Sequence, residues 1–414
     1  MGVGGFLRRE FSFIEGNYRV LIISWMIMDL AMELPVPYYQ QYVQALGGDQ
    51  FPLALGVIGF ANFIGMAVVA LPGGFLADRY GRRWLIATMT FGIGISYVLF
   101  ALAPTWHLIL IGTIIHSLCL IYQPALFAMV QDSLPAERRG IGSSLIQMIH
   151  GTFNTPGPVL AGFFFWAFGL ITGMRIMYTI VTILFLIAAI WRLQLKETVQ
   201  STEKMRFRYF ISSYPRAVKE SFEVWKHIPR TMAWLFLVQV VFMFANALTN
   251  VINARYATEY LGIPNELWFL TFIPLLLTMI AASIPIGKAV DKFGPKKPLI
   301  FGPVVLAGGA LLFVHGDFFT VMASMILFGL VHLLIMSSAM ALSAELVGPE
   351  NRGKVRGSLN FVGYIFTGIG MLLGNYLFNL HPPLPFYMTI ALAIPIVLMI
   401  LFRVHEPQKQ STTS

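Results

Sequence analysis

The segment GFLADRYGRR, residues 74–83, decides the fold, because a related segment, GKAVDKFGPKK at residues 287–297, recurs later in the chain. Both contain a glycine, three further residues, an aspartate, a basic residue, an aromatic residue and a second glycine, followed by more basic residues. Their aspartates, Asp78 and Asp291, are 213 residues apart. This single offset predicts a repeat only if another pair of segments shares it.

A second pair of segments has the same offset. DSLPAERRG, residues 132–140, and ELVGPENRG, residues 345–353, place Arg139 and Arg352 213 residues apart. Two unrelated motifs with one offset predict that the chain contains two copies of the same unit. Repeated halves are typical of secondary transporters.

The composition around these motifs is that of an integral membrane protein. Of the 414 residues, 57% are hydrophobic and 11% charged, and the mean hydropathy is +0.73, whereas soluble domains carry about 25% charged residues. A spanning helix needs about 20 mostly apolar residues. We predict an all-α membrane protein with twelve such helices, at roughly 18–46, 52–77, 83–103, 107–131, 140–168, 174–192, 231–256, 266–290, 298–314, 318–343, 355–380 and 386–403.

The basic residues support this topology and fix its expected orientation. With the N-terminus in the cytoplasm, 26 of the 28 lysines and arginines fall in cytoplasmic segments, and only Arg175 and Arg255 lie at outer helix ends. This distribution follows the positive-inside rule. We therefore expect a multi-pass protein of the plasma membrane with both termini in the cytoplasm, and we expect the first apolar run to be retained as a span.

The net charge of +9 does not predict nucleic-acid binding, because the basic residues stand in short blocks between apolar runs. Cys119 is the only cysteine, so no intramolecular disulfide is expected. No Walker sequence, nucleotide fingerprint or set of nucleophile, base and acid is visible. We expect neither an enzyme nor a cofactor.

With these motifs in place, the chain resembles the major facilitator superfamily over essentially its whole length. The resemblance rests on the twelve spans, the long middle loop and the signature G-x-x-x-D-R-x-G-R-R with its later echo. It implies two six-helix bundles, a monomer, and a cytoplasmic cluster that latches the outward-facing state. The residues assigned to this gate are Gly74, Asp78, Arg79, Gly81, Arg82, Arg83, Arg139, Gly287, Asp291, Lys292, Gly294 and Arg352.

Two features of the gate leave alternatives open. Arg82 and Arg83 equally fit a role as topology signals only. In the second copy Pro295 is inserted and lysines replace arginines. Because lysine lacks the planar fork of arginine, we expect a weaker latch there.

The segment NTPGPVLAG, residues 154–162, contains G-P-x-x-A-G and resembles the antiporter-associated motif of the family. The match is partial, because Phe153 stands where that motif has a glycine. The alternative is a helix that is kinked at Pro156 and Pro158 and packs closely through its glycines.

Asp29 and Glu33 are the only acids inside a predicted span and away from its ends. They are four residues apart and share one helix face. An acid at mid-depth costs at least about 2.5 kcal/mol and marks a pathway or relay by default. We predict a proton-coupling pair; the alternative is a structural pair buried against donors of the fourth or fifth helix.

Further polar residues inside predicted spans are candidates for a substrate cavity. Stripes of such residues occur on the fifth and seventh helices, and the family resemblance places most of the set around one central site. For each lone histidine or asparagine, hydrogen bonding between helices is the alternative. The candidates are His116, Gln123, Gln147, His150, Asn154, Asn246, Asn250, Asn253, His332, Asn360 and Tyr364.

We therefore predict a secondary transporter that moves a small organic solute by alternating access. We expect proton coupling and export, as in a drug–proton antiporter. The open alternatives are a proton-coupled importer of sugars or organic acids, a divalent-metal transporter using Asp29, Glu33, His116 and His150, and a membrane sensor that transports nothing. The expected parts are a cytoplasmic N-terminus (1–17), two bundles (18–192 and 231–403), a linker with an interfacial amphipathic helix (193–230) and a polar tail (404–414).

Overall fold

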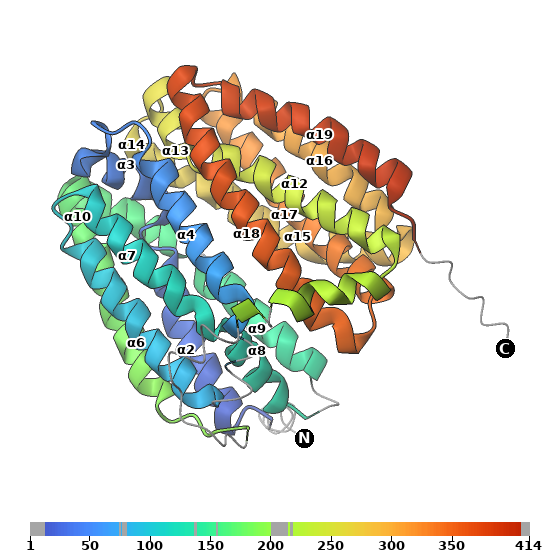
Figure 1. The fold of residues 1–414 in the computed structure, drawn as a ribbon. Helices are drawn as coiled ribbons and strands as arrows, with labels where there is room; N and C mark the ends of the chain where they lie inside the picture. Colours follow the sequence, from blue (N-terminus) through green and yellow to red (C-terminus); the bar gives the residue numbers. More distant parts are fainter. Residues whose placement is uncertain are drawn as a thin grey trace, which may run out of the picture. The chain divides into compact units, whose positions relative to one another are not determined.

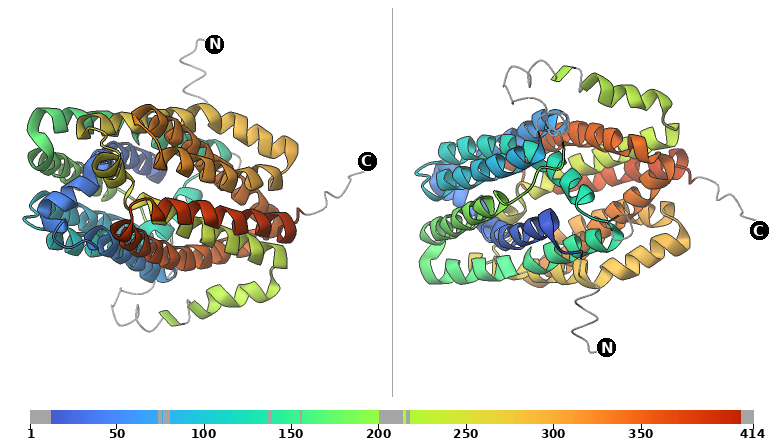
Figure 2. Two further views of the ribbon diagram at one scale, coloured as in Figure 1. Left: turned by 90° about the horizontal axis from the view of Figure 1, so that it is seen from above. Right: turned by 90° about the horizontal axis from the view of Figure 1, so that it is seen from below.

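The structure is a computed structural model that describes residues 13–73, 76, 81–135, 139–154, 156–199, 214–215 and 218–406. Every regular element in these residues is a helix, of α, 3-10 or π type (Figures 1 and 2). Ten of the described helical segments are long and apolar enough to cross a membrane, and Ala54–Ala70 is a shorter apolar helix. Large apolar side chains such as Trp166 and Phe319 are exposed, as lipid-facing residues are. The predicted all-α membrane fold is confirmed.

The helices of the first half follow the predicted spans. They are α2 (Gly16–Met32), α3 (Tyr39–Val43), α4 (Ala54–Ala70), α6 (Arg82–Ala101), α7 (Trp106–Cys119), α8 (Gln123–Asp132), α9 (Arg139–Asn154) and α10 (Pro156–Arg192). The predicted fourth span is interrupted between α7 and α8 by the 3-10 turn η3 (Leu120–Tyr122), and Pro124 stands in the first turn of α8. Proline suits that position because it has no N–H to leave unpaired.

Helix α10 contains the outer part of the predicted fifth span and all of the sixth. The two parts meet at Gly169, where φ is 70° and ψ is −180°, a conformation essentially restricted to glycine. Gly173 then lies so close to the preceding turn that a Cβ there would stand 2.8 Å from the carbonyl oxygen of Phe164. Glycine at both positions allows two spans to join without a loop.

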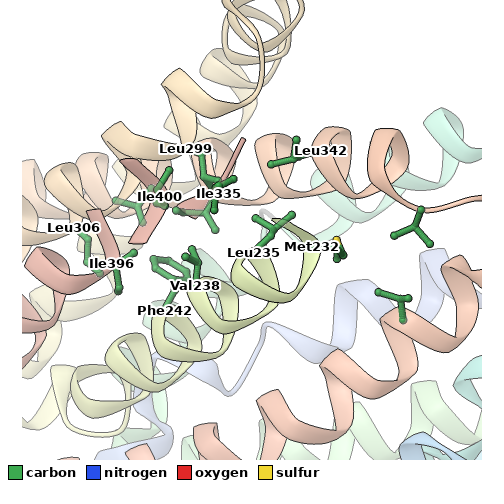
Figure 3. Packing of buried hydrophobic residues seen from close by; sticks show 14 of the residues in the cluster. Met232, Leu235, Val238, Phe242, Leu299, Leu306, Ile335, Leu342, Ile396 and Ile400 are labelled. Atoms are coloured by element: carbon green, nitrogen blue, oxygen red, sulfur yellow. The ribbon is translucent and has the colours of Figure 1, made fainter. Parts of the chain in front are cut away.

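The second half contains α12 (Arg230–Asn250), α13 (Asn253–Arg255), α14 (Asn265–Trp268), α15 (Phe272–Phe293), α16 (Lys296–Val314), α17 (Phe318–Leu346), α18 (Pro349–Leu380) and α19 (Leu384–Arg403). Its core lies where α12, α16, α17 and α19 meet, and ten of its side chains are labelled in Figure 3. Lipid tails are as apolar as these side chains, so close packing holds such helices together. The labelled residues are Met232, Leu235, Val238, Phe242, Leu299, Leu306, Ile335, Leu342, Ile396 and Ile400.

The chain divides into two compact units. Unit 1 contains residues 1–42 and 68–217, and unit 2 contains residues 43–67 and 218–414. Most of α4 therefore groups with the second half. A Cβ at Gly56 of α4 would stand 3.1 Å from Cα of Leu372 in α18, and the Asn375 amide donates to the carbonyl oxygen of Pro52 at 2.8 Å.

The end of the linker packs on unit 2. The Trp225 indole donates to the hydroxyl of Ser358 at 2.8 Å, and the Trp225 ring lies 4.7 Å from that of Phe236. The apolar side chains that predict an interfacial helix thus contact α12 and α18. We call the end of each unit at which α6 and α16 begin its basic end, since Arg82, Arg83, Lys296 and Lys297 stand there.

Candidate functional site

The predicted acid pair lies at the outer part of α2. Asp29 is thirteen residues from the start of α2 at Gly16, or about 20 Å along the helix axis. Asp29 is 4% exposed, whereas Glu33, the C-cap of α2, is half-buried. The two acids therefore differ in environment: Asp29 is inside the bundle and Glu33 stands at a helix end.

Asp29 faces a histidine of the fifth predicted span. His150 of α9 places Nδ1 2.7 Å from Oδ2 of Asp29. The His150 ring also lies 5.7 Å from that of Trp25, in an edge-on arrangement. An aspartate and a histidine in contact hold one proton between them near neutral pH, either as an ion pair or as two neutral groups. Such a couple can take up or release a proton without leaving a lone buried charge.

The fifth span is held close to α2 on both sides of this pair. Towards the start of α2, the Tyr18 hydroxyl donates to the carbonyl oxygen of Gly142 at 2.8 Å. Towards its end, a Cβ on Gly157 would stand 2.6 Å from Cβ of Glu33 and 2.8 Å from its carbonyl carbon. The glycine of the Gly-Pro pair is therefore required by its close approach to Glu33.

Arg192, the last residue of α10, is a functional candidate that the sequence analysis missed. We counted it as a cytoplasmic charge, but it is fully buried in unit 1. Its Nε donates to the Ser24 hydroxyl at 3.0 Å, its Nη1 donates to the Thr90 hydroxyl at 2.8 Å, and its guanidinium lies 5.4 Å from the Tyr122 ring. Ser24 and Thr90 each stand eight residues inside their helices. Its place at a helix end concealed an inward-pointing side chain.

The other cavity candidates of unit 1 do not join the Asp29–His150 pair through a described contact. His116 is half-buried on α7, with its ring edge-on to Tyr97 at 5.2 Å. Gln123 begins α8 and is half-buried. Because η3 separates them, the prediction that both lie on one continuous helix face is wrong. The side chains of Gln147 and Asn154 lie outside the described part of the chain.

The cavity candidates of unit 2 occupy several helices. The predicted stripe of Asn246, Asn250 and Asn253 is interrupted, because α12 ends at Asn250 and Asn253 begins α13, where its side chain accepts from the N–H of Ala254 at 2.7 Å. The remaining three are placed as follows: His332 is exposed on α17, Asn360 is half-buried on α18, and the Tyr364 ring lies 5.9 Å from that of Phe63.

At the basic end of unit 1, the arginines that begin α6 contact two acids that the sequence analysis did not single out. Arg82 forms an ion pair with Asp132, at the end of α8. The carboxylate of Glu197 accepts from the backbone N–H groups of Arg82 and Arg83, both at 3.0 Å, and so caps α6. Arg83 also donates to the carbonyl oxygen of Leu193 at 2.8 Å. These contacts go beyond the role of topology signals.

The environment of Glu197 stabilises its charged form. Burial raises the pKa of this carboxyl, but backbone N–H groups of Arg82, Arg83, Thr198 and Val199 donate to it and lower its pKa below the ordinary value.

The basic end of unit 2 repeats this arrangement. Gly81 and Gly294, which are 213 residues apart, both have positive φ, 94° and 80°, and each precedes a helix of its unit. Glu406, after α19, accepts from the N–H of Lys296 at 2.7 Å, as Glu197, after α10, does for α6. Lys296 also donates to the carbonyl oxygen of Leu401 at 3.0 Å. The internal repeat therefore extends to three-dimensional contacts.

The remaining gate candidates are only partly described. Asp291 and Lys292 are exposed on α15, as expected for the end of a helix, and Gly287 is half-buried there. Arg352 donates to the carbonyl oxygens of Ala344 and Val347 and so caps the end of α17. Gly74, Asp78 and Arg79 lie outside the described residues, as does the side chain of Arg139. Within the part of the chain that is described, no three His, Cys, Asp or Glu residues gather as a metal site would require.

Comparison with known proteins agrees with this fold. The profile of the Major Facilitator Superfamily matches residues 21–274 and 235–414. The multidrug resistance protein MdtG of Escherichia coli O9:H4 (strain HS) is 22% identical over 295 residues, which are 68% of each chain. A D-xylose–proton symporter has the same fold, with a TM-score of 0.71 at 17% identity, covering 94% of this chain and 97% of that one.

The human organic anion transporter MFSD10 (TETRAN) also has this fold, with a TM-score of 0.68 at 16% identity, covering 93% of this chain and 98% of that one. The relatives found by sequence and by structure are transporters, not enzymes. With two family matches that together run from residue 21 to residue 414, the chain belongs to the Major Facilitator Superfamily and is a multi-pass membrane transporter.

Proposed function

We propose that the protein exports a small organic solute in exchange for protons. The observation that carries this proposal is the contact between Asp29 and His150 inside unit 1, 2.7 Å apart and braced by Trp25. This couple binds one proton between two groups, and a membrane-buried acid is otherwise expensive to keep. The similarity to a multidrug resistance protein over 68% of the chain favours export over import.

The remaining candidates have supporting roles in the proposal. Glu33 stands one turn beyond Asp29 and is more exposed, so it is the group that passes protons to and from the couple. The polar residues predicted on both units contact the solute, and the basic ends, including the undescribed Asp78, form the cytoplasmic gate. The protein works as a monomer, with both termini in the cytoplasm.

The test is a ligand-induced shift of the melting temperature of the purified protein. The panel contains lipophilic cations, sugars, organic acids and divalent metals, each at about pH 5.5 and about pH 7.5, on either side of the ordinary histidine pKa. A ligand that binds only the folded protein raises its stability by mass action. We expect a lipophilic cation to give a larger shift at the higher pH, where proton competition is weaker, and Asp29→Asn/Glu33→Gln and His150→Gln to remove that pH dependence.

The matched control is Glu259→Gln, which removes an acid that pairs with Arg255 at an exposed position. This variant should keep the pH-dependent shift. A shift that is independent of pH in the wild type and unchanged in the double variant would make Asp29 and Glu33 structural. Acid-driven accumulation in right-side-out vesicles, instead of everted ones, would replace export by import.

A further inference from the structure

A groove opens on the surface of unit 2 between the start of α12 and the end of α19. Its volume is about 510 Å³, and it is lined by Trp234, Leu398, Met399, Phe402 and Arg403. The four residues from α19 occupy one face of its last turns, and Trp234 faces them from the first turns of α12. The groove is thus apolar along its length and cationic at the basic end.

The cationic end of the groove is formed by two arginines. The guanidinium of Arg403 lies 5.2 Å from the Trp234 ring, and Arg230 stands one turn before Trp234 on the same face of α12. Both arginines are exposed, and among the described residues neither pairs with a carboxylate. The first turn of α12 adds its unpaired N–H groups and the positive end of its helix dipole to the same place.

The apolar part of the groove is open to the hydrocarbon of a bilayer. Leu398 is 47% exposed and Phe402 is 69% exposed. Both precede Arg403 along α19, so they continue away from the cation towards the middle of the membrane. An acyl chain that follows them would keep its phosphate beside Arg403.

The equivalent arginine of unit 1 shows that this arrangement is not imposed by the repeat. Arg192 also ends the last helix of its half, but it is buried and donates to Ser24 and Thr90. In unit 2 the arginine at the end of the last helix is exposed and lies over a tryptophan. The two halves therefore use the same position differently, and of these two arginines only the second offers its cation to a ligand.

We propose that this groove binds an anionic phospholipid, with the phosphate held by Arg403 and Arg230 and an acyl chain packed on Phe402 and Leu398. Basic pockets between helix ends recognise lipid headgroups in this way, and a nearby lysine or arginine contributes about a fivefold gain in affinity. The proposal needs the basic end to lie at a membrane surface, and it does not depend on proton coupling or on the transported solute.

The test uses phospholipids whose acyl chains carry bromine, which quenches tryptophan fluorescence on contact. The full-length protein is placed in phosphatidylcholine nanodiscs that contain either brominated phosphatidylglycerol or brominated phosphatidylcholine. We expect preferential quenching by phosphatidylglycerol, weakened by salt. Trp234→Phe should remove the preferential component, and Arg403→Gln and Arg230→Gln should each reduce the preference about fivefold.

The matched control is Lys354→Gln, which removes an exposed cation of α18 outside the groove. It should keep the full preference, and all variants should melt at the wild-type temperature in pure phosphatidylcholine. Equal quenching by both lipids, or a preference that survives Arg403→Gln/Arg230→Gln, would overturn the proposal. Displacement of the brominated lipid by inorganic phosphate would also overturn it, because a free anion would then be the occupant.

Discussion

Arg192 shows how a single buried cation can connect four helical elements of unit 1. Its guanidinium bridges Ser24 of α2 and Thr90 of α6 from the end of α10, and it lies over Tyr122 of η3. Both hydroxyls already donate to carbonyl oxygens of their own helices, those of Leu21 and Ile86. The arginine is therefore held by acceptors that do not need it in return.

This arrangement predicts an unusual order of substitutions at position 192. Arg192→Lys keeps the buried charge but cannot reach both hydroxyls, so it should lose about 1.5–3 kcal/mol, the contribution of one charged hydrogen bond. Arg192→Met removes the charge and leaves both hydroxyl donors satisfied, so it should cost less. Thermal unfolding of the purified variants measures the order. A lysine variant as stable as the methionine variant would show that the planar fork is unimportant.

At the same scale, the sequence identifies the residues of the coupling pair but not their partners. Asp29 is recognisable because it is an isolated acid in an apolar span, and His150 because it is polar at mid-depth. Their contact depends on how α2 and α9 pack, which no spacing within one helix encodes. Arg192 was missed for the opposite reason, since a basic residue at a helix end is the ordinary topology signal.

Among the elements, the bent fifth span depends on one glycine. Gly157→Ala would place a methyl group against Cβ and the carbonyl carbon of Glu33, and overpacking of this kind costs about 1–3 kcal/mol. We expect a lower melting temperature and loss of the pH-dependent ligand shift, because α10 must move away from α2. Gly308→Ala is the control, since a Cβ at that position in α16 has no neighbour within 4 Å. Equal effects of the two substitutions would contradict this explanation.

The cap of α6 by Glu197 predicts a pH dependence of stability. Its pKa in the folded protein is lowered, so the stabilisation is fully present above the unfolded value of about 4.3 and is lost as the pH falls through the folded pKa. Glu197→Gln should therefore melt below the wild type at neutral pH, and this difference should shrink as the solution is acidified below about pH 4. A difference that stays constant with pH would assign the effect to shape and not to charge.

The sequence predicts elements better than their interruptions. Each of the twelve predicted spans contains described helix, because long apolar runs bounded by basic blocks are a strong signal. The breaks at η3 and between α12 and α13 were not predicted, although they divide the stripes that contain His116 and Gln123, and Asn250 and Asn253. Periodicity assumes a continuous helix, so it assigns residues on either side of a break to one face when they lie on different elements.

On the scale of the whole molecule, the 213-residue repeat is the feature that sequence and structure share most fully. It was read from two loop motifs, and it recurs in the positive φ of Gly81 and Gly294 and in the glutamates that cap α6 and α16. Glu197 and Glu406 could have been found from sequence, because each closely follows the last helix of its half. The grouping of most of α4 with the second half could not, since it depends on tertiary packing against α18.

The same scale carries the prediction of orientation in the membrane. If the positive-inside rule sets the topology, Lys226 before α12 faces the cytoplasm and Glu259 after α13 faces the outside. Cys119 is the single cysteine and would be replaced first, by Cys119→Ser, to give a background without thiols. In intact cells a membrane-impermeant thiol reagent should label Glu259→Cys and not Lys226→Cys, and both should react after the membrane is permeabilised. Labelling of Lys226→Cys alone in intact cells would invert the topology and place the basic ends, with the Glu197 and Glu406 caps and the lipid groove, on the outer side.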